Sequence, residues 1–427
     1  MFQTFRNAWK IEELRKKILF TLFVLLLYRL GNAVPVPYVD TALLANYFTS
    51  VQDTVLGLYN TMSGGAFSSA TIFALSIQPY INASIIIQLL TIAIPALERM
   101  AKEEGEEGKK KIASITRYST VGIGLVQGFA YYVLIQRNAL LTADGSSVWA
   151  AIVIIMTFTA GSALLMWLGE QITEFGIGNG ISIILFASIV SRFPSSIYGM
   201  FTGVAEGTLP WYVMVLMLLG ALAIVVLIVV VQNAERRIPV QYSKRVVGRK
   251  LYGGQSTHLP MKVNMSGVLP VIFAQSIASL PATIAALVGS SDNWFLRIFD
   301  SDTPWYALIY LMLIVFFSYF YSTVQFNPVE IANNLKKNGG FIPGYRPGRP
   351  TSEFIQKVLN KITLFGAVFL GIIAVTPIVI SMFSEAAKSS GISLGGTSVI
   401  IVVGVALETV KALESQMLMR HYKGFLE

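Results

Sequence analysis

Long apolar runs restrict this chain to folds that span a membrane. A helix needs about 20 consecutive apolar residues to cross the ~30 Å hydrocarbon layer of a bilayer. Inside lipid every backbone polar group must be bonded within the protein, which favours helices. Ten such runs occur, at residues 18–36, 76–97, 114–136, 148–170, 177–193, 211–232, 267–288, 304–325, 362–382 and 396–416. The sequence therefore predicts an all-α polytopic membrane protein with ten transmembrane helices.

The positive charges predict how these spans are oriented. Of 32 Lys and Arg residues, 27 fall on one side of the membrane if the spans alternate, in segments 1–17, 99–117, 236–262, 336–361 and 411–427. Basic loops stay in the cytoplasm, so we expect both termini there. The first 17 residues are basic and amphipathic, and no convincing cleavage site follows. They predict an interfacial helix rather than a cleaved signal peptide.

The spans divide into an N-terminal half, 1–210, and a C-terminal half, 211–427. Five spans in each half give the halves opposite topology, a pattern typical of inverted-repeat membrane proteins with a site near the midplane. Two long basic loops interrupt the second half, at about 232–266 and 325–361. The first predicts a β-hairpin-like projection, and the second a short helix at about 328–337 before a Gly/Pro-rich tip. They are either ordinary positive-inside loops or a docking surface for a large acidic or RNA-containing partner.

Most catalytic chemistry is missing from the sequence. The chain has no cysteine and only two histidines, His258 and His421, which are far apart. The P-loop, HExxH and GxSxG patterns do not occur. Glu170 and Glu408 are the main carboxylates within spans, and both lie near predicted span ends, which argues against a proton pathway. We expect no catalytic residue, no metal site and no cofactor.

One stretch, SGGAFSSATIFALSIQPYINASIIIQLL at 63–90, combines two kinds of structure. It begins with a glycine pair and a serine cluster, like a loop. It ends as an apolar span, after a Pro-Tyr-Ile-Asn break at 79–82. The sequence predicts a short separate segment in front of a membrane helix.

This stretch and four others resemble the bacterial SecY family. The others are MWLGEQITEFGIGNGISII, QSTHLPMKVNMSGVLPVIFAQSI, FNPVEIANNLKKNGGFIPGYRPG and GGTSVIIVV, and the resemblance runs from the basic N-terminus to the last span. It implies two five-helix halves arranged as a clamshell around a protein-conducting pore. It also implies partners: SecE-like and SecG-like small membrane subunits, a SecA-type ATPase motor, the ribosome and a translocating signal-bearing polypeptide.

The resemblance also assigns residues. A short plug helix at about 59–72 would include Tyr59, Asn60, Ser63, Gly64, Gly65 and Phe67. An aliphatic pore ring would comprise Ile77, Ile81, Ile181, Leu185, Ile272 and Ile401. A lateral gate between spans two and three and spans seven and eight would include Asn82, Gln88, Gln275 and Leu280. Partner docking would use Arg245, Lys250, Arg346, Arg349 and the arginine of the RVVGRK tip, Arg249, which follows Gly248.

Two other classes compete with a protein channel of no catalytic activity. Ten spans, inverted halves and interrupted second and fifth segments also fit a secondary transporter of a small solute. Such a transporter needs polar or charged ligands at the midplane, where this chain offers aliphatic residues. An intramembrane enzyme needs a catalytic constellation, which the sequence lacks. Leakage of ions after deletion of 59–69 would distinguish a channel from a transporter.

Overall fold

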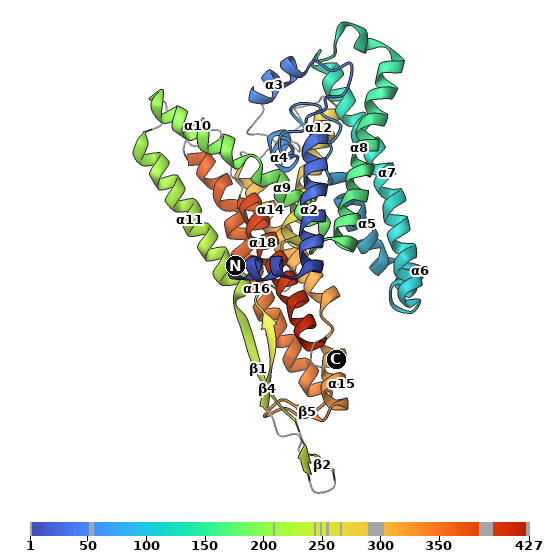
Figure 1. Cartoon of the computed structure of the whole chain (residues 1–427), viewed down its shortest axis with the longest axis vertical. Coiled ribbons are helices and arrows are strands. Elements are labelled where there is room, and N and C mark those ends of the chain that lie inside the picture. The colour runs from blue at the N-terminus through green and yellow to red at the C-terminus, as the bar shows by residue number, and fades with distance from the viewer. Residues whose placement is uncertain are drawn as a thin grey trace.

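The computed structural model describes residues 2–50, 55–207, 210–242, 245–247, 250–252, 256–264, 267–288, 303–383 and 396–423. Most of them are helical (Figure 1). The first half comprises α1 (Phe2–Lys10), α2 (Glu12–Gly31), α3 (Thr41–Ser50), α4 (Val55–Met62), α5 (Gln78–Ala93), α6 (Pro95–Lys102), α7 (Gly105–Arg137), the 3₁₀ turn η1 (Ala143–Ser146), α8 (Val148–Phe175), α9 (Gly180–Val190) and α10 (Phe193–Ala205).

The second half adds six further helices and a small amount of sheet. The helices are α11 (Trp211–Asn233), α12 (Leu269–Val288), α14 (Pro304–Gln325), α15 (Pro328–Lys337), α16 (Arg349–Phe383) and α18 (Gly396–Lys423), of which α15 is the short one. The strands are β1 (Glu235–Tyr242), β2 (Arg245–Val247), β3 (Lys250–Tyr252), β4 (Ser256–Lys262) and β5 (Gly340–Phe341). Each of the ten predicted spans coincides largely with a helix.

Fewer helices than ten are long and apolar enough to cross a membrane by themselves. Within the described ranges seven qualify, or eight if α5 and α6 count as one bent span. Helices α5 and α6 meet at an angle of 105° where Pro95 begins α6, because proline cannot continue the hydrogen-bond ladder of the preceding helix. The charged start of α2 and the shorter described apolar stretch of α12 account for the difference from the prediction.

The largest hydrophobic core lies where both halves meet. It contains buried residues of α2, α5, α8 and α9 together with residues of α11, α12, α14, α16 and α18. A second core packs α3 and the turns that follow α4 against α7 and α8. The segment between α4 and α5 thus lies between two packed cores.

A projection formed by both long loops extends from one end of the molecule (Figure 1). Strand β1 pairs antiparallel with β4, and its last two residues pair with β5 of the second loop. Ile238 and Val240 point into a small core shared with Leu335, Ile355 and Leu359. The predicted hairpin and the predicted helix at 328–337 are both confirmed. The two loops pack together as one unit, a contact that the sequence did not predict.

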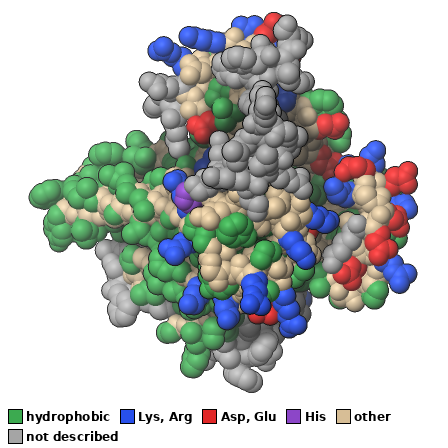
Figure 2. Space-filling model, turned by 90° about the horizontal axis from the view of Figure 1, so that it is seen from below, with side chains coloured by type: hydrophobic (Ala, Val, Ile, Leu, Met, Phe, Trp, Pro, Cys, Tyr) green, Lys and Arg blue, Asp and Glu red, His purple; other side chains and the backbone are tan. Residues whose placement is uncertain are grey.

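Helices α10 and α11 form an arm that leans away from the bundle (Figures 1 and 2). Only 6% of the most apolar stretch of α11 is buried, and Leu216, Leu222 and Val230 are strongly exposed. A helix that is apolar on all sides needs lipid or another apolar partner around it. This surface agrees with a multi-pass membrane protein.

Candidate functional site

Six aliphatic side chains from four helices converge in the main core. Ile77 and Ile81 come from the start of α5, and Leu185 comes from α9. Ile272 and Ile401 come from α12 and α18 in the other half, and each of these five is less than 7% exposed. Ile181, at the start of α9, is partly buried and packs against the same cluster. The structure therefore places the six predicted ring residues in one hydrophobic core at the junction of the two halves.

The predicted plug segment lies against this cluster but differs in secondary structure from the expectation. The helix α4 ends at Met62, so only the first four residues of 59–72 are helical. The rest is a series of turns that continues to α5. Helix α4 contacts α9 and α12, and Met62 belongs to the main core. The expected helix over the whole segment is wrong, because the glycine pair ends it early.

The glycine turn after α4 is held by local hydrogen bonds to the side chains of Asn60 and Ser63. Gly64 and Gly65 have φ of +67° and +90°, a conformation that side chains with a Cβ adopt with strain. The Asn60 carboxamide oxygen accepts from the Ser68 backbone N–H at 2.9 Å, and the Ser63 hydroxyl accepts from the Phe67 N–H at 3.0 Å. These bonds fold the chain back directly after the helix.

Two buried hydroxyl groups fasten this turn to the neighbouring helices. The Tyr28 hydroxyl on α2 donates to the carbonyl of Ser63, at 3.2 Å. It also lies 2.6 Å from the Ser188 hydroxyl on α9. A Cβ on Gly64 would approach the Ser188 carbonyl to 3.0 Å, so the turn packs closely on α9. The sequence analysis did not identify Tyr28 and Ser188. Their role becomes evident only from their hydrogen bonds at this turn in the structure.

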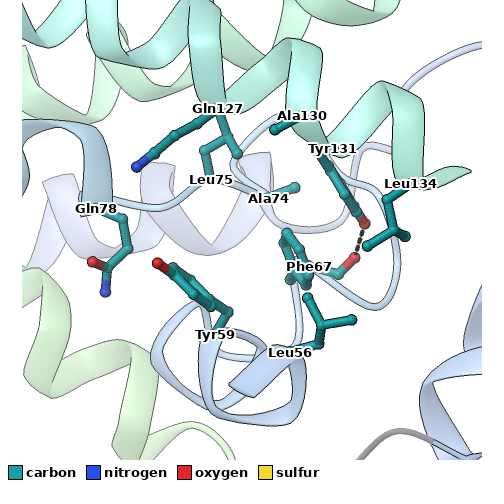
Figure 3. Close-up of a pocket in the computed structure, with 10 residues that line it drawn as sticks. All are labelled: Leu56, Tyr59, Phe67, Ala74, Leu75, Gln78, Gln127, Ala130, Tyr131 and Leu134. Atoms are coloured by element: carbon teal, nitrogen blue, oxygen red, sulfur yellow. Dashed lines mark hydrogen bonds between the residues drawn. The ribbon is translucent and has the colours of Figure 1, made fainter. Parts of the chain in front are cut away.

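Phe67 anchors the turns that follow. Its ring stacks on Tyr131 of α7 with centroids 4.2 Å apart, and the Tyr131 hydroxyl donates to the Phe67 carbonyl (Figure 3). Phe48 of α3 meets the Phe67 ring edge-on, at 5.3 Å. Beside this anchor is a mainly apolar cavity of ≈ 560 Å³, including its open mouth, and Tyr59, Gln78 and Gln127 are among the residues that line it.

The predicted gate helices do pack along a common seam. Helix α12 contacts α5 and α7, and the Gln88 amide of α5 donates to the Tyr321 hydroxyl of α14 at 3.2 Å. Gln275 of α12 is buried and donates to the Met62 sulfur, as does Gln78 of α5. Asn82 lies half-buried one turn after Gln78. Leu280 belongs to α12, but its side chain lies outside the described residues.

The tip of the second loop presents Arg346 on a restrained turn. Gly344 and Gly348 have φ of +86° and +107°. The Tyr345 ring stacks on Phe354 at 4.2 Å, and the Thr351 hydroxyl donates to the Arg346 carbonyl at 2.8 Å. Arg346 itself is exposed.

Of the other predicted docking residues, the structure describes the side chain of Arg349 but not those of Arg245, Arg249 and Lys250. Arg349 pairs with Glu353 at 3.0 Å. Arg245 and Lys250 lie on β2 and β3, with side chains outside the described residues, and Arg249 lies wholly outside them. Lys and Arg side chains surround this end of the molecule (Figure 2).

The two carboxylates predicted to lie near span ends are Glu170, which forms an ion pair, and Glu408, which is exposed. Glu170 of α8 accepts from the Arg117 guanidinium of α7 at 2.9 Å, which ties two neighbouring helices. Glu408 lies on the exposed side of α18. Within the described ranges, no three His, Asp or Glu side chains are grouped closely enough to hold a metal ion.

A bundle of this shape, with an aliphatic convergence between two halves, has close counterparts among solved protein-conducting channels. One is a SecY structure concerned with how its plug domain stabilises the closed state; it is 17% identical with a TM-score of 0.68, over 94% of this chain and 92% of that one. Another is Sec61 in a canine ribosome–channel complex, 16% identical with a TM-score of 0.62, over 94% and 92%. The chain thus shares the fold of these protein-conducting channels.

Sequence comparison gives the family. The SecY family model matches residues 71–410. The protein translocase subunit SecY of Streptomyces scabiei is 43% identical over 442 residues, covering 100% of both chains. The chain belongs to the SecY family of protein-conducting channels.

Proposed function

We propose that this chain moves unfolded, signal-bearing polypeptides across a bacterial cell membrane and releases apolar segments sideways into lipid. The observation that carries the proposal is the convergence of Ile77, Ile81, Leu185, Ile272 and Ile401 from both halves, with Met62 of α4 in the same core. A ring of uncharged, stiff side chains excludes ions by dewetting and fits loosely around chains of any sequence. Ten spans in two inverted halves, 1–210 and 211–427, would form the clamshell.

In this proposal α4 and the following turns act as the plug, and the seam between α5/α7 and α12/α14 acts as the lateral gate. Met62 of the plug lies in the same core as the ring residues, and Phe67 of the plug stacks on Tyr131 of α7. Among the residues that the structure describes, the Gln88–Tyr321 hydrogen bond crosses the gate seam. Weak polar contacts of this kind contribute roughly 0.6 kcal/mol each within membranes, so the seam can part at low cost.

The energy for transport would come from partners, since the chain has no P-loop. We infer that a SecA-type ATPase motor or a ribosome docks on the joint projection of β1, β4 and α15. The canine Sec61 structure contains a ribosome, and basic side chains gather at this end here. The Streptomyces relative is called a translocase subunit, which supports SecE-like and SecG-like companions.

Reconstitution into proteoliposomes tests the function. With a motor ATPase and a signal-bearing precursor, we expect precursor to become protease-protected only when the chain is present. Deleting 59–69 should raise the resting ion conductance, because it removes Met62 and Phe67 together. Lack of protected precursor in vesicles that contain the chain and its companions would contradict the proposal.

A further inference from the structure

Met62 occupies an unusual position at the end of α4. It is only 4% exposed, and its sulfur accepts two hydrogen bonds. The Gln78 amide donates from α5 at 3.2 Å, and the Gln275 amide donates from α12 at 3.3 Å. The two donors belong to the two helices that face each other across the proposed gate. One sulfur atom therefore bridges both gate helices and the plug.

The neighbours of this bridge connect it to the ring. Gln78 directly follows ring residue Ile77, and Gln275 lies three residues after Ile272, on the same face of α12. Both glutamines are 4% exposed, and the Gln275 carbonyl oxygen has no hydrogen-bond partner among the described residues. The two amides are therefore buried and depend on Met62 for the bonds that the structure gives their NH₂ groups.

Sulfur is a weak acceptor, which suits a contact that must break often. A carboxylate or amide oxygen at this place would hold the two glutamines more firmly. Removing the acceptor altogether would leave two buried donors unpaired, which is costly. The thioether satisfies the amides while the channel is closed and releases them easily.

We propose that Met62 is a positioning residue that couples the plug to the lateral gate. If α5 and α12 separate, the sulfur can keep at most one of its donors, so gate opening loosens the plug. By reciprocity, loss of the plug frees both amides and weakens the seam. The inference rests on the proposed plug and gate, and it adds the residue that joins them.

A set of variants tests the coupling in planar bilayers. Met62→Leu keeps the volume but removes the acceptor, and we expect the resting ion conductance to rise about fivefold or more, as unpaired buried donors disfavour the closed state. The triple variant Met62→Leu, Gln78→Leu, Gln275→Leu removes donors and acceptor together. Its conductance should return to within about twofold of the wild type, since replacing both partners by apolar groups is nearly neutral.

A control and a second measurement make each outcome decisive. Met166→Leu changes a buried methionine of α8 for which the structure gives no hydrogen bond, and it should leave conductance unchanged. All variants should elute as wild type on gel filtration. Wild-type conductance in Met62→Leu, or a triple variant as leaky as the single one, would overturn the coupling. Precursor transport in the same vesicles is scored separately, so its failure bears on the proposed function and not on Met62.

Discussion

In the proposed channel, side chains at the junction of the two halves would provide both packing and the seal with the same atoms. The Ile81 and Ile272 side chains are almost fully buried although they come from helices that the proposed mechanism must separate. Isoleucine contributes packing without a polar group that would have to be satisfied when water enters. Serine at these positions would remove most of this packing and add a hydroxyl group that favours water.

Replacing Ile81, Ile181 and Ile272 together with serine should raise resting ion conductance and relax the need for a strong signal sequence. Each change removes roughly 2 kcal/mol or more of buried packing and introduces a hydroxyl that favours water. Conductance in planar bilayers measures the effect. Ile154→Ser on α8, outside the main core, loses similar packing and should stay closed. A triple variant as tight as the wild type would refute the ring.

Arg346 is expected to be the most important single contact for a docking partner. Its turn is restrained by Gly344, Gly348 and the Tyr345–Phe354 stack, so the guanidinium is presented at little entropic cost. Arg346→Glu should abolish motor-driven precursor transport, and Arg346→Lys should impair it partly because lysine lacks the planar fork. Arg349→Lys, at a residue already paired with Glu353, is the milder comparison. Normal transport by the glutamate variant would leave Arg346 without this role.

At the scale of elements, close backbone approaches fix where the segment after α4 lies. A Cβ on Gly161 of α8 would lie 1.9 Å from the Ile72 carbonyl oxygen, an impossible distance. Helix α8 therefore packs directly on the backbone of this segment. Only glycine fits at position 161 without moving the Ile72 backbone, and this contact cannot be recognised from the sequence alone.

Gly161→Ala should destabilise the protein by about 1–3 kcal/mol, because backbone atoms must move to make room. Gly122→Ala on α7 is the matched control, since nothing lies within 4 Å of its added Cβ. The control should gain up to about 1 kcal/mol from the better helix propensity of alanine. Thermal unfolding in mild detergent measures both. Equal melting temperatures for the two variants would show that the close approach is not rigid.

Sequence reasoning placed helices well and placed contacts between distant segments poorly. Apolar length alone located α11 and α14 almost to the residue, because lipid leaves few alternatives to a helix. The resemblance named Asn82 and Gln275 as gate residues, whereas the structure bonds Gln78 and Gln275 to Met62. Gln78 and Asn82 are four residues apart on one face of α5, so periodicity cannot choose between them. That choice depends on how α4 lies over the seam.

At the scale of the whole molecule, the two ends differ in character. One end carries the projection of β1, β4 and α15, and the other carries α3 (Figure 1). The distribution of Lys and Arg predicts that the projecting end faces the cytoplasm. Because the chain has no cysteine, a single introduced thiol reports on one site only.

Val329→Cys at the start of α15 and Ser146→Cys in η1 should react on opposite sides of the membrane. Both positions are exposed. A membrane-impermeant maleimide should label Ser146→Cys in intact spheroplasts and Val329→Cys only in inverted vesicles. Labelling of both from the same side would contradict the orientation, and the cysteine-free parent serves as the blank.

The anchor at Phe67 has a consequence for how quickly the proposed channel recovers after a substrate has passed. Met62 is five residues from Phe67, so an extended chain lets it travel no more than about 17 Å from a fixed point. Its effective concentration at the vacated seat is then in the millimolar range. Resealing becomes a first-order event whose rate does not depend on protein concentration. In the proposed channel, a plug tethered in this way would limit ion leakage between one translocated polypeptide and the next without requiring any other molecule.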